Sequence, residues 1–272
     1  MKRNWETEIV DPVKGRKDKP RKTGLTMVLD KGLGLNELDD ILLMGGEYID
    51  FIKFSFGTSF VCPLEVVKKK IEKIKKWSIK VFPGGTLFEI AVTQNKINEY
   101  LFKAKQLGFN AVEISNGSIT YDGNLRKEVI GKARDLGFMV LTEVGKKDNA
   151  KSLPVKSMVN QLQSDIKNGA GLVIIEARES GKNISIYEED GSVNTGKFEK
   201  LYKGIGNWEE NILWEAPLKK QQVFMIKKFG PNVNLGNINA GEVNSLETLR
   251  RGLRGDTFKL TNKDDEETYL IG

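Results

Sequence analysis

The sequence contains no histidine among its 272 residues, and its only cysteine is Cys62. The lack of histidine excludes Ser-His-Asp triads, Cys-His pairs and metal sites with histidine ligands. A single cysteine excludes an intrachain disulfide. Acid–base chemistry must therefore come from Lys, Asp, Glu, Tyr or Cys. Any bound metal would be a hard cation with oxygen ligands, for which Mg²⁺ is the leading candidate.

Long apolar runs are also missing. No stretch approaches the roughly 20 apolar residues of a membrane helix, and the charged N-terminal segment lacks the apolar core of a signal peptide. We therefore expect a cytoplasmic protein with no membrane partner. Lys and Arg number 43 against 37 Asp and Glu, but no nucleic-acid-binding motif accompanies this excess. The expected partner is thus a small anionic substrate rather than a nucleic acid.

Apolar runs of strand length alternate with helical patterns along the chain. These runs cover residues 24–30, 48–55, 79–85, 111–115, 138–144, 171–178, 211–217 and 232–238. Near-continuous apolar strands separated by helices are typical of a parallel sheet. Eight such units in about 250 residues predict a single-domain α/β protein, a (β/α)8 TIM barrel, over 24–272 after a charged segment at 1–23. The alternative is a doubly wound open sheet, whose G-x-G-x-x-G turn "DKGLGLNE" does not match.

Charged and polar residues gather near the predicted ends of these strands. The carboxyl ends of barrel strands build the active site in this fold, and side chains alternate between the two faces of a strand. Lys53 thus lies opposite Ile52 and Phe54, which would meet the helices. The residues near the strand ends are Asp30, Lys31, Lys53, Glu113, Ser115, Glu143, Lys146, Lys147, Glu176, Arg178, Glu215, Asn234 and Asn237.

This convergence favours a site over a set of solvated strand ends, because buried charges are costly unless they are paired. Acidic groups and cations at one rim imply a metal ion together with a polyanion. The glycines of "PGGT", Gly84 and Gly85, and Gly236 of "LGNI" offer backbone N–H groups that suit phosphate.

The motifs at the strand ends resemble those of the phosphosulfolactate synthase family. They are "GLTMVLDKGLG", "YIDFIKFSFGTS", "PGGTLFE", "AVEISNGS", "LTEVGKKD", "VIIEARESG", "WEAPLKKQQ", "VNLGNI" and "LRRGLRGDTF". The resemblance spans residues 24–258. It implies a barrel that adds sulfite to phosphoenolpyruvate with Mg²⁺ and forms (R)-2-phospho-3-sulfolactate, a reaction that opens coenzyme M biosynthesis in methanogens.

The resemblance also implies roles for individual residues. Sulfite is already a nucleophile, so no activating histidine is needed. Lys147, which shares strand parity with Glu143 if the strand continues through Gly145, is the expected general acid at C2, and Lys146 is the alternative. The remaining candidates are Lys53 and Arg178 for phosphate or carboxylate, Asp30, Glu143, Glu176 and Glu215 for the metal, and Gly84, Gly85, Ser115, Asn234, Gly236 and Asn237 for substrate.

Two other interpretations stay open. Lys53 lies mid-strand among apolar neighbours, where it would suit a Schiff-base aldolase on the same barrel. A non-catalytic, stress-related barrel is the second alternative. In each case we expect a homo-oligomer, since barrels of this size commonly self-associate.

Overall fold

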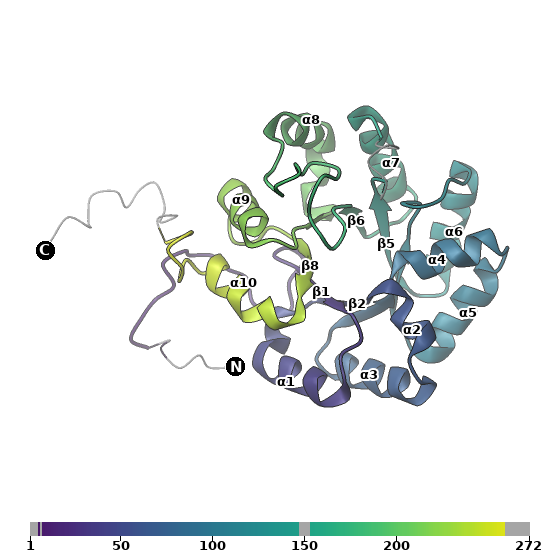
Figure 1. The fold of residues 1–272 in the computed structure, drawn as a ribbon, viewed down its shortest axis with the longest axis horizontal. Coiled ribbons are helices and arrows are strands. Elements are labelled where there is room, and N and C mark those ends of the chain that lie inside the picture. Colours follow the sequence, from purple (N-terminus) through teal and green to yellow (C-terminus); the bar gives the residue numbers. More distant parts are fainter. Residues whose placement is uncertain (1–4, 6, 147–152, 259–272) are drawn as a thin grey trace, which may run out of the picture.

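The computed structural model describes residues 5, 7–146 and 153–258. The strands lie in one parallel sheet in the order β3-β2-β1-β8-β7-β6-β5-β4. The sheet curls into a nearly closed ring inside the helices (Figure 1), so the predicted (β/α)8 barrel is confirmed. Each predicted run contains one strand: β1 (Thr26–Asp30), β2 (Phe51–Phe54), β3 (Lys80–Pro83), β4 (Ala111–Ile114), β5 (Met139–Val144), β6 (Leu172–Ile175), β7 (Ile212–Glu215) and β8 (Leu235–Asn239).

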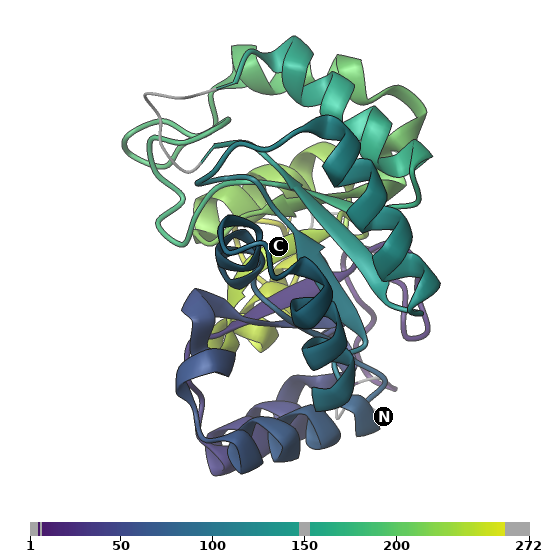
Figure 2. The ribbon, with the colours of Figure 1, turned by 90° about the vertical axis from the view of Figure 1, so that its right-hand side faces the viewer.

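Helices form the outer layer of the barrel, as the side view in Figure 2 shows. Helix α3 illustrates why they form: Val67, Ile71 and Ile74 recur at helical spacing and are buried, while lysines in its last turn favour the negative end of the helix dipole. The helices are α1 (Leu35–Gly45), α2 (Thr58–Val61), α3 (Leu64–Lys76), α4 (Gly85–Thr93), α5 (Ile97–Leu107), α6 (Gly123–Asp135), α7 (Val155–Lys167), α8 (Thr195–Ile205), α9 (Lys219–Phe229) and α10 (Val243–Arg250).

Two apolar clusters fill the molecule, one inside the barrel and one between strands and helices. Phe51 of β2 belongs to the inner cluster, whereas Ile52 and Phe54 belong to the outer one. Side-chain alternation therefore turns Lys53 into the barrel. Likewise, Ile174 of β6 lies inside and Ile175 outside, which aims the next residue, Glu176, at the barrel interior.

One junction of the barrel differs from the others. Strands β3 and β4 are in contact but form the two ends of the hydrogen-bonded strand order. Asn110, just before β4, spans this junction: its backbone N–H donates to the carbonyl oxygen of Val81 at 3.3 Å, and its side-chain Oδ1 accepts from the N–H of Val81 at 2.8 Å. We call this junction the β3–β4 seam.

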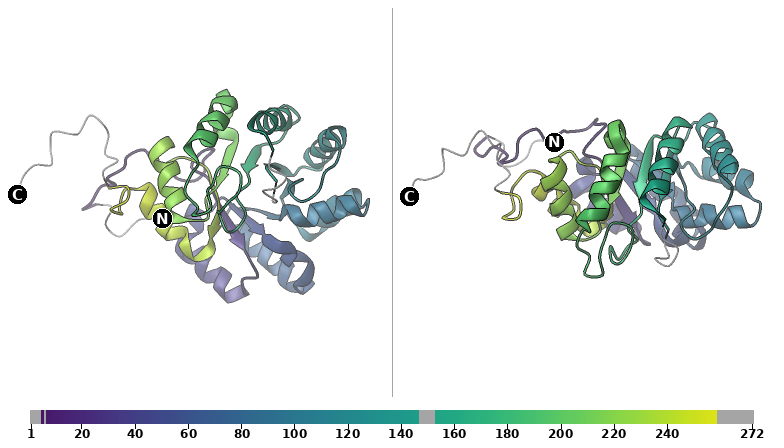
Figure 3. Two further views of the ribbon diagram at one scale, coloured as in Figure 1. Left: turned by 45° about the horizontal axis from the view of Figure 1, so that its top comes forward. Right: turned by 90° about the horizontal axis from the view of Figure 1, so that it is seen from above.

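The N-terminal segment packs against the amino end of the barrel and against α10 (Figure 3). Val13 is buried and its N–H donates to the carbonyl of Arg251. The buried guanidinium of Arg16 pairs with Glu247, and Arg21 pairs with Asp50. Among the residues that the structure describes, no helix is both long enough and apolar enough to cross a bilayer.

Candidate active site

A cavity of about 410 Å³ lies at the carboxyl ends of the strands. Its walls come from β1, β2, β5, β7 and β8, from the N-terminus of α4, and from the loop after β6. Most of the side chains that sequence placed at a catalytic rim meet here. The predicted site residues in the lining are Lys53, Gly84, Gly85, Glu143, Glu176, Arg178, Glu215 and Asn237.

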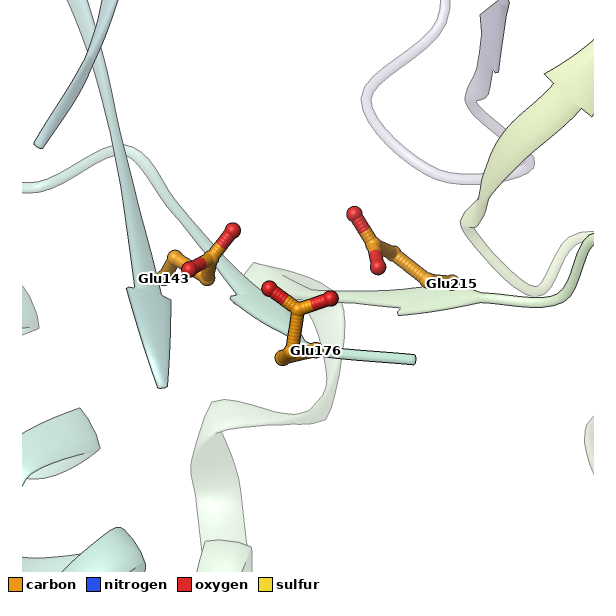
Figure 4. Close-up of side chains that lie close together, drawn as sticks. All are labelled: Glu143, Glu176 and Glu215. Atoms are coloured by element: carbon orange, nitrogen blue, oxygen red, sulfur yellow. The ribbon is translucent and has the colours of Figure 1, made fainter. Parts of the chain in front are cut away.

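Three glutamates point toward one another across the floor of this cavity (Figure 4). Glu143 lies in β5, Glu176 directly follows β6, and Glu215 ends β7. All three are buried, and one carboxylate oxygen of each lies within 4.8 Å of the others. Adjacent parallel strands bring these three side chains together, because each glutamate lies at or next to the carboxyl end of its strand and faces inward.

Lys53 faces these glutamates from β2. Its Nζ lies 2.9 Å from Glu113 Oε2 and 3.5 Å from Glu215 Oε1. Burial lowers the pKa of Lys53, but the surrounding carboxylates, Glu113 foremost and then Glu215, outweigh this effect and raise the pKa well above its ordinary value. Lys53 is thus a fixed positive charge inside the barrel.

The cavity holds more negative than positive charge. Within the described residues, the glutamates at positions 113, 143, 176 and 215 act on the ammonium group of Lys53, and Arg178 is the other basic residue in the cavity lining. Burial first, and then the Glu143 and Glu215 carboxylates, raise the pKa of Glu176 well above its usual range. Burial also raises the pKa of Glu215, although Lys53 opposes that shift. Crowded buried carboxylates of this kind need a proton or a cation to offset their repulsion.

The chemistry of this group fits a hard divalent cation. Oxygen ligands from three carboxylates are what Mg²⁺ prefers. Glu176 Oε1 accepts a hydrogen bond from the backbone N–H of Arg178, whereas its buried Oε2 has no hydrogen-bond partner among the described residues. A buried acceptor without a donor is costly, and a cation shared with Glu143 and Glu215 would satisfy it.

Strained backbone shapes the cavity wall. Phe56, Arg178 and Asn237 all line the cavity and have φ values of 55°, 58° and 55°. Left-handed conformations outside glycine cost energy and cluster at functional sites. The turn at Arg178 brings its N–H back to Glu176, and Asn237 Nδ2 donates to the carbonyl of Arg178 at 3.1 Å. The turn therefore fixes one carboxylate of the glutamate group.

The two glycines of "PGGT" place a helix end at the cavity. Gly85 begins α4, and a Cβ at this position would lie 2.4 Å from Glu113 Oε1 and 2.5 Å from the Cβ of Ser115. Only glycine lets the helix approach β4 this closely. The unpaired N–H groups of a helix N-terminus favour an anion, so this wall suits the negatively charged part of a substrate.

A sequence model of the (2R)-phospho-3-sulfolactate synthase (ComA) family matches residues 14–256 of the chain. The chain belongs to this family. It is 51% identical over 237 residues to the phosphosulfolactate synthase of Methanocaldococcus jannaschii, covering 86% of this chain and 94% of that protein. It is 45% identical over 249 residues to the phosphosulfolactate synthase of Methanothermobacter thermautotrophicus, covering 91% and 96%.

A solved structure supports the fold independently of the sequence match. The 3-hexulose-6-phosphate synthase from Salmonella typhimurium superposes with a TM-score of 0.55 over 82% of this chain and 97% of that chain, at 14% identity. At this identity the likeness shows the barrel and nothing of the chemistry. The phosphosulfolactate synthase family assignment rests on the sequence matches alone.

Asp30, Asn234 and Gly236 were predicted for the site but do not line the cavity, and each has another structural role; Ser115 lies behind the cavity wall rather than in its lining. Asp30 ends β1 on the face of Val28, toward the helices, where its carboxylate pairs with Lys70 and accepts from the N–H groups of Gly32 and Leu33. Asp30 is therefore not part of the glutamate group.

Asn234 and Gly236 are the other two. Asn234 precedes β8 and lies at the amino end of the barrel. There its Oδ1 accepts from the N–H of Leu25, and its Nδ2 donates to the carbonyl oxygen of Ile212. Placing it in the substrate site is wrong. Gly236 lies in β8, and a Cβ there would come within 2.3 Å of the Leu213 side chain and 2.7 Å of the Met27 side chain. Its role is close packing inside the barrel rather than contact with phosphate.

The structure describes only one of the two lysines that follow β5. Lys146 Nζ donates at 2.6 Å to the carbonyl oxygens of both Asn116 and Ile119, so it secures the loop after β4 and does not line the cavity. Lys147 lies outside the described residues. β5 ends at Val144 and Gly145 has a φ of 131°, so strand alternation stops before the lysines and does not decide between them.

Two further acidic residues belong to the site without a role assigned from sequence. Glu113 of β4 pairs with Lys53. The sequence could have assigned Glu113 to the site, because it is an inward-facing charge in an apolar strand, two residues before Ser115. Glu89 of α4 contacts Ser115 across the cavity wall. Helical spacing alone does not distinguish Glu89 from a solvated residue, so only the structure finds it.

Proposed function

We propose that this chain is a phosphosulfolactate synthase, an enzyme that adds sulfite to phosphoenolpyruvate and gives (R)-2-phospho-3-sulfolactate. The observation that carries the proposal is the combination of the family match with a cavity in which three buried glutamates face Lys53. Both substrates are anions, and the cavity also offers them Arg178 and the N-terminus of α4. We also propose that it acts in the cytoplasm at the start of coenzyme M biosynthesis.

The reaction makes one bond and moves one proton. The lone pair on sulfur attacks the methylene carbon of phosphoenolpyruvate and forms a C–S bond, while the C=C electrons move toward the substrate carboxylate. A proton then adds to C2 from one face, which sets the R configuration. No bond to phosphate breaks, so the protein must bind the phosphate without activating it as a leaving group.

The residues that would hold Mg²⁺ are Glu143, Glu176 and Glu215. The bound ion would supply stabilisation of the negative charge that develops on the substrate carboxylate. On the protein side, the N–H groups of Ala177 and Arg178 hold the carboxylates of Glu215 and Glu176 in place. Lys53 offsets part of the charge of the group when the substrate anions enter.

We propose Lys147 as the proton donor to C2. Lys53 is the one lysine that lines the cavity within residues 7–146 and 153–258, and its raised pKa makes it a poor donor near neutral pH. Lys146 is committed to two carbonyl oxygens. Lys147 directly follows it in the chain, and Gly145 lies so close to Glu176 that a Cβ there would be 2.8 Å from the Glu176 Cβ. The chain therefore leaves β5 beside the glutamates.

Incubation with phosphoenolpyruvate, sulfite and Mg²⁺ tests the proposal. We expect mass spectrometry to detect phosphosulfolactate, with no product when the metal-free protein is assayed in excess chelator. Full activity in chelator would remove the metal from the mechanism while leaving the synthase in place. No product under any metal condition would overturn the synthase itself and favour the non-catalytic alternative.

The Schiff-base aldolase alternative needs a neutral lysine amine. The glutamates around Lys53 keep it protonated, which favours sulfite addition over imine formation. Borohydride reduction with a keto-acid substrate separates the two: a mass increase on the peptide that contains Lys53 would support the aldolase, and an unmodified peptide would support the synthase.

We also propose that the protein self-associates through an apolar groove beside the cavity. The groove, about 870 Å³, lies between α2, α4 and α5, and Phe56 lines both it and the cavity. Exposed apolar side chains edge it: Phe56, Phe60, Val61, Leu64 and Ile90. Contiguous apolar surface of this kind marks interaction sites. A mass measurement in solution should give an oligomer that Phe60→Asp weakens, and a wild-type monomer would contradict the proposal.

A further inference from the structure

A buried hydroxyl joins Glu143 of the cavity to helix α4. Ser115, which directly follows β4, is fully buried. Its Oγ lies 2.7 Å from Glu143 Oε1 and 2.5 Å from Glu89 Oε1. Hydrogen bonds that involve a carboxylate are short and stronger than those between neutral groups. Glu143 is therefore connected through one side chain to a helix that contributes no carboxylate to the metal site.

Glu89 anchors this connection. It lies on α4, one helical turn after Gly85, and is 2% exposed. The backbone N–H of Ser118 lies 3.3 Å from Glu89 Oε1 and 3.2 Å from Oε2. The carboxylate of Glu89 is thus held from the helix on one side and from the loop after β4 on the other.

The backbone around Glu143 and Ser115 is fixed independently. The carbonyl oxygen of Glu143 accepts from Arg126 Nη2 at 2.9 Å, and Arg126 forms a buried ion pair with Asp165 at 2.7 Å. The hydroxyl of Tyr121 donates to the carbonyl of Ser115 at 3.1 Å. With both main chains held, the remaining freedom of Glu143 is rotation of its own side chain, and Ser115 is placed to restrict it.

We propose that Ser115 and Glu89 are positioning residues that aim the Glu143 carboxylate at Glu176 and Glu215. The inference rests on the proposed metal site. Groups that hydrogen-bond a metal ligand set its orientation and contribute to metal affinity. Since Gly85 of the same helix lines the cavity, the connection also ties the position of Glu143 to the wall that suits the substrate anion.

We call the connection from Glu143 through Ser115 to Glu89 the bridge. The single hydrogen of its hydroxyl predicts how substitutions of Glu89 should act. A hydroxyl has one hydrogen, so Ser115 donates to one of the two carboxylates at a time. Glu89→Gln supplies an amide that can donate to Ser115 Oγ, which frees the serine hydrogen for Glu143. Glu89→Asp keeps the charge but shortens the side chain away from Ser115 and Ser118. The two substitutions should therefore act differently.

Binding of Mn²⁺, followed by electron paramagnetic resonance, tests the inference without an activity assay. Ser115→Ala should weaken Mn²⁺ binding by about 10-fold, the usual effect of removing a partner of a metal ligand. Ser118→Ala is the matched control, because it removes a hydroxyl from the same loop at an exposed position whose backbone alone contacts Glu89. The control should bind Mn²⁺ as the wild type does. Unchanged binding by Ser115→Ala would overturn the inference.

If Ser115→Ala does not fold, the two substitutions of Glu89 test the inference instead. Glu89→Asp should weaken Mn²⁺ binding several-fold, while Glu89→Gln should stay within about 3-fold of wild type; equal binding by both would contradict the bridge. Failure of the wild type to bind Mn²⁺ would also overturn it. If Mn²⁺ binds as expected and no phosphosulfolactate forms, the bridge stands and the proposed function falls, so the two failures are distinguishable.

Discussion

The two ends of the barrel bury charges in opposite ways. At the amino end, the ionic groups are matched: Arg16 Nη2 lies 3.0 Å from Glu247, and Arg21 Nη2 lies 2.8 Å from Asp50. At the carboxyl end, four glutamates act on Lys53, which is the one lysine in the cavity lining within the described part of the chain. The matched charges complete the structure without any other molecule. At the other end, which we call the unmatched end, these carboxylates outnumber the basic side chains that the described residues place beside them, and a cation or protons would offset the excess.

This difference separates structural from functional charge in one fold. Stability alone does not explain why these glutamates lie together, since crowded buried carboxylates are costly. Burial first, and then the neighbouring carboxylates, raise the pKa values of Glu176 and Glu215. An excess of buried carboxylates among the described residues is therefore the best physical sign of where ligands bind.

The largest effect should come from a cation that belongs to the unmatched end. We expect Lys147→Ala and Lys147→Arg each to lower kcat by about 10²–10⁴-fold, the worth of a general acid, because guanidinium keeps the charge but does not release its proton near neutral pH. Affinity for phosphoenolpyruvate should change less. Steady-state kinetics measures both. Near-normal turnover of Lys147→Arg would reduce the residue to an electrostatic role.

Breaking a match at the amino end should damage stability and leave chemistry alone. Arg16→Met removes a guanidinium whose side chain is fully buried beside Glu247. We expect a loss of about 3 kcal/mol, the lower end of what a broken buried pair costs, because Glu247 also pairs with Arg251 at 2.8 Å. Denaturant unfolding measures the loss. A change in kcat of the folded variant would argue that the two ends are not independent.

Removing one charge from the unmatched end should stabilise the metal-free protein. The pKa of Glu176 is raised in the folded state, so its contribution to stability is present below the ordinary carboxyl pKa of 4.5 and is lost as pH rises through the raised value. Glu176→Gln should therefore melt higher than wild type at pH 8, by about 2–4 °C for each kcal/mol of repulsion removed.

At pH 5 the difference in melting temperature should shrink, because the wild-type carboxyl then carries its proton. Calorimetry in chelator measures both values, and Mn²⁺ should protect the wild type more than the variant. A lower melting temperature of Glu176→Gln at pH 8 would mean that the glutamate group is not repulsive.

The smallest effect should come from Lys146, a cation at the same end that already has partners. Its Nζ binds two carbonyl oxygens of the loop after β4, so Lys146→Ala should lower kcat by less than about 10-fold, well below the loss of a general acid. The same assay that tests Lys147 measures it. A loss as large as that of Lys147→Ala would show that Lys146 is the donor.

The sequence was sufficient for every strand and for most of the cavity, because period-two alternation and strand ends follow from local rules. Asp30 could have been excluded by the same rule, since it shares the outward face of Val28. Asn234 could not, because a polar residue in an apolar run can belong to either end of a strand. Glu89 could not be predicted from the sequence, because its contact with Ser115 depends on how closely α4 approaches β4 at Gly85.

At the β3–β4 seam the described strands share no backbone ladder. The other neighbouring strands are joined by backbone ladders, but here Asn110 supplies the hydrogen bonds to Val81. Lys53 of β2 reaches Glu113 of β4 across this line, and Gly85 after β3 packs on the same glutamate. The charges that serve the cavity thus also connect the two sides of the seam, and we expect backbone amides along it to exchange more slowly when a ligand occupies the cavity.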